Sequence, residues 1–427
     1  MRQMKNSGIE WIGAIPSSWD VHPVYFYFSE RKNKNIFGSE QNLLSLSYGN
    51  VIRKDINTVG GLLPESFNTY NIVEENDIVI RPTDLQNDKR SLRTGLCKEH
   101  GIITSAYIAL KPIRSASIVN TSYVHYLLHT YDIMKVFYNM GNGVRQSLNF
   151  AEFSKLMIFI PPIEEQKAIA EYLDILCANV DSLVADIQAQ IEALEQYKRS
   201  VITEAVTKGL NPDAEMKDSG IEWLGFIPAT WQIRKGKYAF VQRNERGNTI
   251  ELQLLSPTQK FGVIPQDLYE EISGFTAVKL NENVDISLLK TIHKGDYCIS
   301  LRSFQGGFEY SEYEGVVSPA YQVFYPVIEV YRGYYKHLFK TQVFIDKMNS
   351  FTMSLRDGKN IAFSDFGNTY LPIPPVDEQQ RIADFLDKKC SEIDSIIAEK
   401  KKQIEAIAEY KKVVIYECVT GKKEFHV

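Results

Sequence analysis

The sequence predicts an α+β fold in which one unit is written twice. We expect two mixed α/β domains separated by two long helices that pair as an antiparallel coiled coil, with a pseudo-twofold axis relating the copies. Three observations lead to this fold. Segments recur at an offset of 212 or 213 residues, the middle of each copy has short strand-like and helical patterns, and two long segments place apolar residues three and four positions apart.

The beginning and the end of the first copy return almost unchanged in the second copy. KNSGIEWIGAIPSSW, residues 5–19, returns as KDSGIEWLGFIPATW, residues 217–231, with ten of fifteen positions unchanged. PPIEEQKAIAEYLD at 161–174 returns as PPVDEQQRIADFLD at 374–387, and QIEALEQYKRSVITEAVT at 190–207 returns as QIEAIAEYKKVVIYECVT at 403–420. The middles show only weak echoes of one another. The sequence therefore predicts one fold used twice, with divergent middles.

Both long helices begin after a Pro-Pro pair followed by two acidic residues, which suits the positive end of a helix dipole. Each would cover about 44 residues, hence about 65 Å. In the first, the apolar stripe is Leu173, Leu176, Val180, Leu183 and Ile187, and after one extra step Ile191 and Leu194. In the second it is Ile382, Leu386, Ile393, Ile396, Ile404 and Ile407. Such a stripe needs a partner, so we expect the helices to pair. The alternative is that each helix lies separately on its own domain.

The middles, roughly 20–155 and 232–370, combine short β-prone runs with aromatic-rich helical patterns at 119–137 and 330–348. The predicted boundaries are 1–160 for the first domain, 161–212 for the first helix, 213–373 for the second domain and 374–427 for the second helix. Trp11, Trp19, Trp223 and Trp231 recur in the repeated ends, and we expect them to anchor those ends in a core.

The composition indicates a soluble protein of two or three domains, because 44% of its 427 residues are hydrophobic and its longest apolar runs fall far short of the roughly 20 residues that span a bilayer. The N-terminus has no apolar signal region, so a cytoplasmic location is expected. Five widely spaced cysteines, with no Cys-x-x-Cys pair, speak against a disulfide framework or a zinc site.

The formal charge of −5 is unevenly distributed. Residues 20–160 carry a net charge of +2 and residues 230–375 carry +1, whereas residues 163–210 carry −5. The acidity therefore belongs largely to the helical parts, and the middles remain compatible with a nucleic-acid partner.

Motifs of catalysis are missing from the sequence. It has no Gly-x-x-x-x-Gly-Lys-Ser/Thr phosphate loop, no Asn/Asp-Pro-Pro-aromatic tetrapeptide of amino-methyltransferases and no His-Glu-x-x-His metal helix. His125 and His129 have the spacing of a bidentate metal grip, but no third ligand is apparent nearby and the second copy has no such pair. The letters of a nuclease core in PDAEMK, residues 212–217, stand too close together to bind a metal. We expect no catalytic residue and no metal in this chain.

The repeated plan resembles the specificity subunit of a type I restriction-modification system. The resemblance covers the whole chain twice over, in the order GIEWIGAIPSSW, a variable middle, PPIEEQKAIAEYLD and a long helix ending EQYKRSVITEAVTKG. It implies that each middle is a target-recognition domain reading one half of an asymmetric bipartite DNA site. It also implies that the helices set the spacing and dock two modification (methyltransferase) subunits, with restriction (translocase/nuclease) subunits as further partners. S-adenosylmethionine, ATP and Mg²⁺ would then belong to partner subunits, and this chain would hold no cofactor.

The physical logic of such a subunit agrees with the sequence. A half-site of three base pairs recurs about once in 64 positions, which is useless against a genome, whereas two half-sites at a fixed separation form a rare target. A stiff helical pair can set such a separation. Because the middles carry little net positive charge, we expect the isolated chain to bind DNA weakly, with a shallow dependence on salt.

The candidates for DNA contact are the side chains that read bases best, Arg, Lys, Gln, Asn and Ser, in corresponding places of the two middles. The first middle contributes Arg81, Gln86, Lys89, Arg90 and Arg93, then Arg145, Gln146 and Ser147. The second contributes Arg302, Ser303 and Gln305, then Arg356, Lys359 and Asn360. Each could instead be an ordinary solvated loop residue. At the level of the whole chain, the alternatives are an assembly scaffold that does not read DNA, and an enzyme whose active site lies in the aromatic middles.

Overall fold

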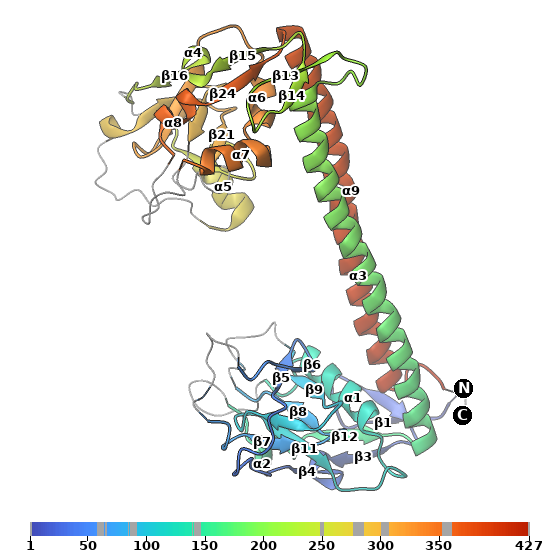
Figure 1. Ribbon diagram of the computed structural model, residues 1–427. Helices are drawn as coiled ribbons and strands as arrows, with labels where there is room; N and C mark the ends of the chain where they lie inside the picture. Colours follow the sequence, from blue (N-terminus) through green and yellow to red (C-terminus); the bar gives the residue numbers. More distant parts are fainter. Residues whose placement is uncertain are drawn as a thin grey trace. The chain divides into compact units, whose positions relative to one another are not determined.

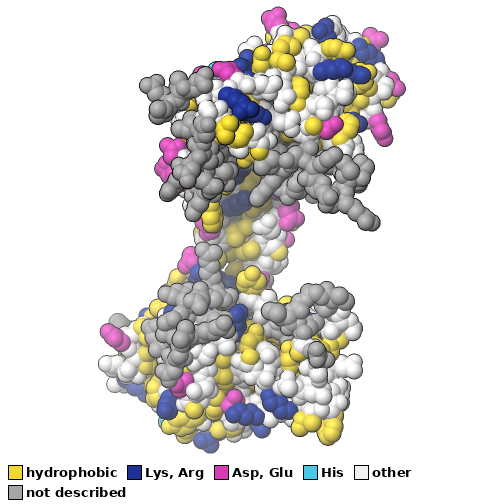
Figure 2. Space-filling model, turned by 90° about the vertical axis from the view of Figure 1, so that its left-hand side faces the viewer, with side chains coloured by type: hydrophobic (Ala, Val, Ile, Leu, Met, Phe, Trp, Pro, Cys, Tyr) yellow, Lys and Arg dark blue, Asp and Glu magenta, His cyan; other side chains and the backbone are white. Residues whose placement is uncertain are grey.

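A computed structural model describes residues 2–57, 64, 66–83, 85, 92–138, 140, 147–247, 252–275, 286–299, 307–351 and 361–425. The remaining residues are grey in Figure 1 and Figure 2. The chain forms two compact units. Unit 1 comprises Met1–Ile187 and Lys402–Val427, and unit 2 comprises Gln188–Lys401. Each unit thus contains one mixed domain and part of each long helix, which is a different division from the linear boundaries that the sequence predicts.

The elements of unit 1 alternate short strands with few helices. They are β1 (Met4–Asn6), β2 (Ala14–Pro16), β3 (Asp20–Pro23), a 3-10 turn (Val24–Phe26), β4 (Phe28–Glu30), β5 (Leu44–Ser47), β6 (Asn50–Arg53), β7 (Asn71–Val73), β8 (Ile78–Ile80), β9 (Thr94–Leu96), β10 (Gly101–Ile103), β11 (Ile108–Pro112), α1 (Thr121–Ile133), α2 (Phe150–Phe153), β12 (Met157–Ile160) and the first part of α3 (Ile163–Lys208).

Unit 2 takes up α3 and continues with β13 (Met216–Asp218), β14 (Phe226–Pro228), β15 (Gln232–Lys235), α4 (Gly236–Ala239), β16 (Phe240–Arg243), β17 (Leu255–Thr258), β18 (Gly262–Pro265), α5 (Gln266–Ser273), a 3-10 turn (Ile286–Leu288), β19 (Lys290–Ile292), β20 (Tyr297–Ile299), β21 (Phe308–Tyr310), β22 (Gly315–Val317), β23 (Gln322–Pro326), α6 (Arg332–Leu338), α7 (Gln342–Asn349), α8 (Phe363–Asn368), β24 (Tyr370–Ile373) and α9 (Val376–Val419), which ends in unit 1.

The two units have the same sheet topology. Unit 1 has an antiparallel sheet of order β4-β11-β8-β9, and unit 2 has one of order β16-β23-β20-β21. The smaller pairs match as well: β12 with β3 and β24 with β15, β10 with β7 and β22 with β19, β5 with β6 and β17 with β18. The internal repeat is therefore confirmed, and it includes the middles, where the sequence has only weak echoes.

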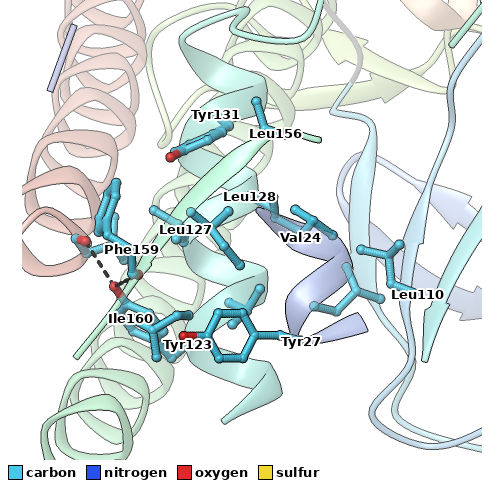
Figure 3. Packing of buried hydrophobic residues seen from close by; sticks show 14 of the residues in the cluster. Val24, Tyr27, Leu110, Tyr123, Leu127, Leu128, Tyr131, Leu156, Phe159 and Ile160 are labelled. Carbon is cyan, nitrogen blue, oxygen red and sulfur yellow. Dashed lines mark hydrogen bonds between the residues drawn. The ribbon is translucent and has the colours of Figure 1, made fainter. Parts of the chain in front are cut away.

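The core of unit 1 surrounds α1, one face of which is buried against β12, the first turns of α3 and the last turns of α9 (Figure 3). Tyr123 is fully buried, and its hydroxyl donates to the carbonyls of Phe159 at 3.1 Å and Val419 at 3.2 Å. The side chain of Asn120 caps α1 by accepting from the backbone N–H of Tyr123. One tyrosine thus ties the domain to the last turn of α9.

Unit 2 repeats this arrangement with more aromatic rings. Tyr334 is fully buried and its hydroxyl donates to the carbonyl of Val206 at 2.6 Å, near the end of α3. Phe240, Phe324 and Phe366 pack with centroids 4.7 to 5.7 Å apart, mostly edge to face. The predicted anchoring role of the tryptophans is confirmed most clearly for Trp19 and Trp231, which are both 0% exposed.

The Pro-Pro-x-x-Glu-Gln motif connects each long helix to its domain. Oε1 of Gln166 accepts from the backbone N–H of Asn120 at 2.8 Å, and its amide nitrogen donates to the carbonyls of Ile118 and Pro161. Gln379 makes the matching bonds to the backbone N–H of Tyr331 and the carbonyl of Pro374. The motif therefore satisfies buried backbone groups that would otherwise lose their hydrogen bonds.

The long helices pair antiparallel within each unit, as predicted. Lys411 donates to Asp181 at 2.6 Å in unit 1, whereas in unit 2 Lys198 donates to Asp394 and Lys400 to Gln190. These lysines lie in the seam at positions where a coiled coil ordinarily has apolar residues. Polar residues at such positions fix the register of the pair, at a cost in stability.

One detail of the predicted apolar stripe is wrong. Leu183 and Ile396 are 48% and 43% exposed, while the neighbouring Val184 is partly buried and Ile397 is buried. With Val184, the seam of α3 runs through Val180, Ile187, Ile191 and Leu194 at alternating steps of four and three, so no extra step interrupts the heptads. The prediction failed because Leu183 also lies within reach of a helical stripe, and only packing chooses between adjacent positions.

None of the helices in the described parts of the chain is both long and apolar enough to cross a bilayer.

Candidate nucleic-acid interface

The first group of candidate residues lies in sequence between the two strands of a β-hairpin. In unit 1, Ile80 of β8 pairs with Thr94 of β9, so residues 81–93 connect the strands at one end of the sheet. In unit 2, Ile299 pairs with Phe308, so residues 300–307 connect the equivalent strands. Gln86, Lys89, Arg90, Arg302, Ser303 and Gln305 fall outside the described residues. Because the topology is shared, both connections start from the same end of their sheets.

Arg81 and Arg93 lie at the base of the first connection, where the backbone N–H of Arg81 donates to the carbonyl of Arg93 at 2.8 Å. Arg81 is partly exposed. Arg93 is fully buried: its Nε donates to the hydroxyl of Tyr138 at 3.0 Å, its Nη1 to the carbonyl of Thr83, and its backbone N–H to the carboxylate of Asp132. The expectation that Arg93 reaches DNA is therefore corrected, because a buried guanidinium is not presented to a partner. It closes the base of the connection instead.

The second group of candidates is joined to the first in unit 1. The backbone N–H of Leu148 donates to the carbonyl of Pro82 at 3.0 Å, so the exposed Ser147 lies close to the base of the β8–β9 connection. Arg145 and Gln146 precede Ser147 and lie outside the described residues. Two segments that are more than fifty residues apart in sequence thus meet at one end of the sheet.

Unit 2 joins its two segments through one glutamine. The amide nitrogen of Gln322 donates to the carbonyl of Ile361 at 2.9 Å, and its Oε1 accepts from the backbone N–H of Phe363 at 2.7 Å. Gln322 also pairs with Ile299, the last residue before the β20–β21 connection. Arg356, Lys359 and Asn360 lie outside the described residues. The residues that follow them, Ile361 and Phe363, are the ones bonded to Gln322. In both units, therefore, described residues that flank the two candidate segments lie at the same end of the sheet.

Buried ion pairs lie at the starts of β8 and β20, the end opposite to the connections, and the sequence analysis missed them. Nη2 of Arg31 donates to Asp77 at 2.9 Å, and Nε of Arg243 donates to Asp296 at 2.7 Å. Asp77 is fully buried, and burial raises its pKa although Arg31 acts in the opposite direction. Arg31 and Arg243 stand 212 residues apart, which is the repeat offset and was the available signal. Because these arginines are paired inside the fold, they position the sheet rather than offer free charge.

The histidine pair of α1 does not form a metal site with other described residues. The rings of His125 and His129 lie 6.1 Å apart, and no group of three His, Cys, Asp or Glu residues converges anywhere in the described ranges. Nε2 of His125 and Nδ1 of His129 are buried without a hydrogen-bond partner. Burial lowers the pKa of His125 to about 3 and that of His129 to about 4, so both are neutral at physiological pH.

Basic side chains lie on the described surface of both units. Figure 2 shows Lys and Arg side chains on this face of both units, beside residues that are drawn grey and among hydrophobic and uncharged ones. Among the described residues visible on each unit, both signs of charge occur and the basic side chains form no continuous patch. This arrangement favours a partner that is recognised by specific loops over one that is held by charge alone.

Comparisons with known proteins show the family to which the two copies are similar. The family described as "Type I restriction modification DNA specificity domain" matches residues 55–193 and 233–406, one match in each copy. A putative type I restriction enzyme MjaX specificity subunit of Methanocaldococcus jannaschii is 26% identical over 317 residues, 70% of this chain and 67% of that protein. The MjaVIII specificity subunit of the same organism is 26% identical over 82% of this chain and 80% of its own length.

Two solved structures share the fold. A chain from a type I R-M system, solved to explain complex assembly and conformational transition, superposes with a TM-score of 0.67 at 12% identity, covering 96% of this chain and 99% of its own. The HsdS subunit from Thermoanaerobacter tengcongensis gives a TM-score of 0.52 at 12% identity, covering 96% and 98% of the two chains. At this identity the likeness concerns the fold alone.

Proposed function

Because this chain belongs to the family of type I restriction-modification DNA specificity domains, we propose that it reads a bipartite DNA sequence on behalf of a restriction-modification complex. Each unit reads one half-site with the two segments that meet at the end of its four-stranded sheet. The observation that supports this proposal is the repeated geometry: in both units, described residues that flank the two candidate segments lie at the same end of the same sheet.

The asymmetry of the site follows from the differences between those segments. The first unit offers Arg81, Gln86, Lys89 and Arg90 and then Arg145, Gln146 and Ser147, whereas the second offers Arg302, Ser303 and Gln305 and then Arg356, Lys359 and Asn360. Since different side chains prefer different base edges, one fold presents two different half-sites. Arg302→Ala is expected to lower affinity about tenfold or more and to relax one base position.

In this proposal, methylation and DNA cleavage are carried out by partner subunits. The repeated ends of the two copies offer equivalent surfaces to two identical modification subunits, which would bind S-adenosylmethionine. Restriction subunits would supply ATP hydrolysis and Mg²⁺. The chain itself would act without catalysis, through residues 1–160 and 213–373 as target-recognition domains and 161–212 and 374–427 as spacer helices that determine the distance between half-sites.

Mapping of methylated adenines in cells tests the proposal directly. Cells that carry the chain with its partner genes should methylate one asymmetric sequence of two parts separated by a constant number of base pairs. Exchanging residues 20–160 for those of a relative should change one part and leave the other unchanged. A chain that assembles with partners but leaves methylation without sequence preference would instead be a scaffold.

A further inference from the structure

Each unit has a second β-hairpin whose tip presents an aromatic residue followed by glycine. In unit 1, β5 and β6 are joined by Tyr48 and Gly49, with Ser47 paired to Asn50. In unit 2, β17 and β18 pair from Leu255 through Thr258, and the tip ends in Phe261 and Gly262. Tyr48 and Phe261 are 213 residues apart, the repeat offset, although the second tip, residues 259–261 between the paired Thr258 and Gly262, is one residue longer.

Tyr48 is an unusual residue for its position. Both tip residues of the first hairpin have positive φ, 46° for Tyr48 and 83° for Gly49, as in a two-residue type I′ turn. Asn, Asp and Gly adopt this conformation readily, whereas a tyrosine there costs conformational energy. Its ring is 81% exposed, so no burial of the ring offsets that cost. A strained, solvated aromatic ring is the kind of feature found at binding sites.

The tip of this hairpin lies next to the candidate DNA-reading end of the sheet. A Cβ on Gly49 would stand 3.2 Å from Cδ1 of Leu92, and one on Gly95 would collide with Leu46 and Val51. Leu92 is itself part of the β8–β9 connection, two residues before Thr94. Tyr48 therefore belongs to the same end of unit 1 as the β8–β9 connection.

The tip in unit 2 has the same orientation toward its sheet. Val263 bridges to Ser311 in parallel, and a Cβ on Gly262 would stand 2.7 Å from the carbonyl oxygen of Tyr310. Tyr310 is the last residue of β21 and Ser311 follows it, and because the bridge is parallel the chain before Gly262 approaches from the side of Phe308, the first residue of β21. Phe261 is 37% exposed, and the ammonium of Lys260 lies 5.0 Å from its ring centroid. An aromatic ring beside a cation suits a base and its phosphate.

Resting on the proposed function, we propose that Tyr48 and Phe261 contact the target DNA through their ring faces, one ring for each half-site. The contact made by the rings is non-polar in both units, and the phosphate contact offered by Lys260 in unit 2 is separate from it and is not removed by Phe261→Ala. A flat ring on a narrow hairpin can pack against a base or deoxyribose where a bulkier loop cannot approach.

Substitutions at Tyr48 separate this role from a structural one. Tyr48→Asn removes the ring and supplies the Asn-Gly dipeptide that a type I′ turn prefers, so the melting temperature should stay the same or rise. Affinity of the chain, assembled with its methyltransferase partners, for target DNA should nevertheless fall about tenfold. Tyr48→Phe should keep full affinity, and Phe261→Ala should match the loss. The dependence of affinity on salt should not change, because no phosphate charge is lost.

Matched controls come from the opposite end of the sheets. Tyr25 and Tyr238 are 55% and 62% exposed and lie three and two residues before the first residues of β4 and β16. Tyr25→Ala and Tyr238→Ala should leave DNA affinity unchanged. Equal affinity of wild type and Tyr48→Asn for the target overturns the inference alone. Loss of partner assembly in Tyr48→Asn, with intact DNA binding, also overturns it and assigns the tip to a protein contact. A wild-type complex with no sequence preference overturns the proposed function together with the inference.

Discussion

The indole N–H of Trp19 donates a hydrogen bond of 3.1 Å to Oε2 of Glu165, across 146 positions of the chain. Trp231 makes the same bond to Glu378 at 3.0 Å. In unit 1 the carboxylate of Glu165 also accepts hydrogen bonds from Nη1 and Nη2 of Arg2, at 2.5 and 2.6 Å. The two repeated motifs, one near the start of each copy and one at the start of its long helix, are therefore parts of a single contact.

Removing the carboxylate should destabilise unit 1. Glu165→Ala leaves a buried indole N–H and a partly buried guanidinium without an acceptor, so the free energy of unfolding should fall by about 2–4 kcal/mol. Urea denaturation monitored by tryptophan fluorescence measures this change. Glu164→Ala, one position earlier and with its side chain 63% exposed, should change stability by no more than about 0.5 kcal/mol. Equal effects of the two variants would mean that the Trp19 contact does not stabilise the domain.

The buried histidine pair should make unit 1 sensitive to acid. In the folded chain the pKa of His125 is lowered to about 3 and that of His129 to about 4, from an ordinary value of 6.5. Between pH 6.5 and pH 4 these two histidines therefore bind protons in the unfolded chain but not in the folded chain, and the free energy of unfolding falls as pH falls. We expect a loss of roughly 3 kcal/mol or more between pH 7 and pH 4.

A double variant isolates this effect from other acid-sensitive groups. His125→Gln with His129→Gln should flatten the pH dependence between pH 6.5 and pH 4, while carboxylates titrate alike in both proteins. Hydrogen exchange of α1 amides reports on unit 1 specifically. Parallel pH profiles of wild type and double variant would contradict the assignment.

The buried carboxyl group of Glu309 in unit 2 should make stability depend on pH in the opposite direction. Its side chain is 1% exposed, and burial raises its pKa to about 7 although Lys340 stands 2.7 Å away and lowers it. As pH rises from 4.5 to 7, the unfolded chain releases a proton that folded Glu309 retains, so this group's contribution to stability declines. The stability difference between wild type and Glu309→Gln should shrink by roughly 3 kcal/mol over that range. Glu312→Gln, at a side chain 62% exposed, serves as the control and should show a constant difference.

Lengthening both long helices should lengthen the DNA spacer. Seven residues inserted after Ile187 in α3 and seven after Lys401 in α9 preserve the heptad register and add about 10 Å of helix, the length of about three base pairs. Methylation mapping should then return the same two half-sites with about three more base pairs between them. An insertion in α3 alone shifts one helix against the other and should abolish modification. An unchanged spacer in the double insertion would show that the helices do not determine the distance.

Local patterns predicted much of this molecule because they depend on short-range chemistry. Pro-Pro followed by acidic residues favours a helix start, and heptad spacing of apolar residues requires a partner helix. The choice between Leu183 and Val184 as seam residue could not be read, since both positions lie near the stripe and the packing of α9 decides. Likewise, Arg93 is an ordinary loop arginine by its neighbours in sequence, and only the fold brings Asp132 and Tyr138 around it.

The sequence by itself determined that the chain repeats one unit, which segments form the long helices, and which family the repeated motifs indicate. Tertiary structure alone decided which side chains remain available to a partner and which two segments meet at the end of each sheet. The physical reason is that periodicity and helix signals act over a few residues, whereas burial of Arg93 or the contact of Leu148 with Pro82 depends on backbone brought together from distant parts of the chain.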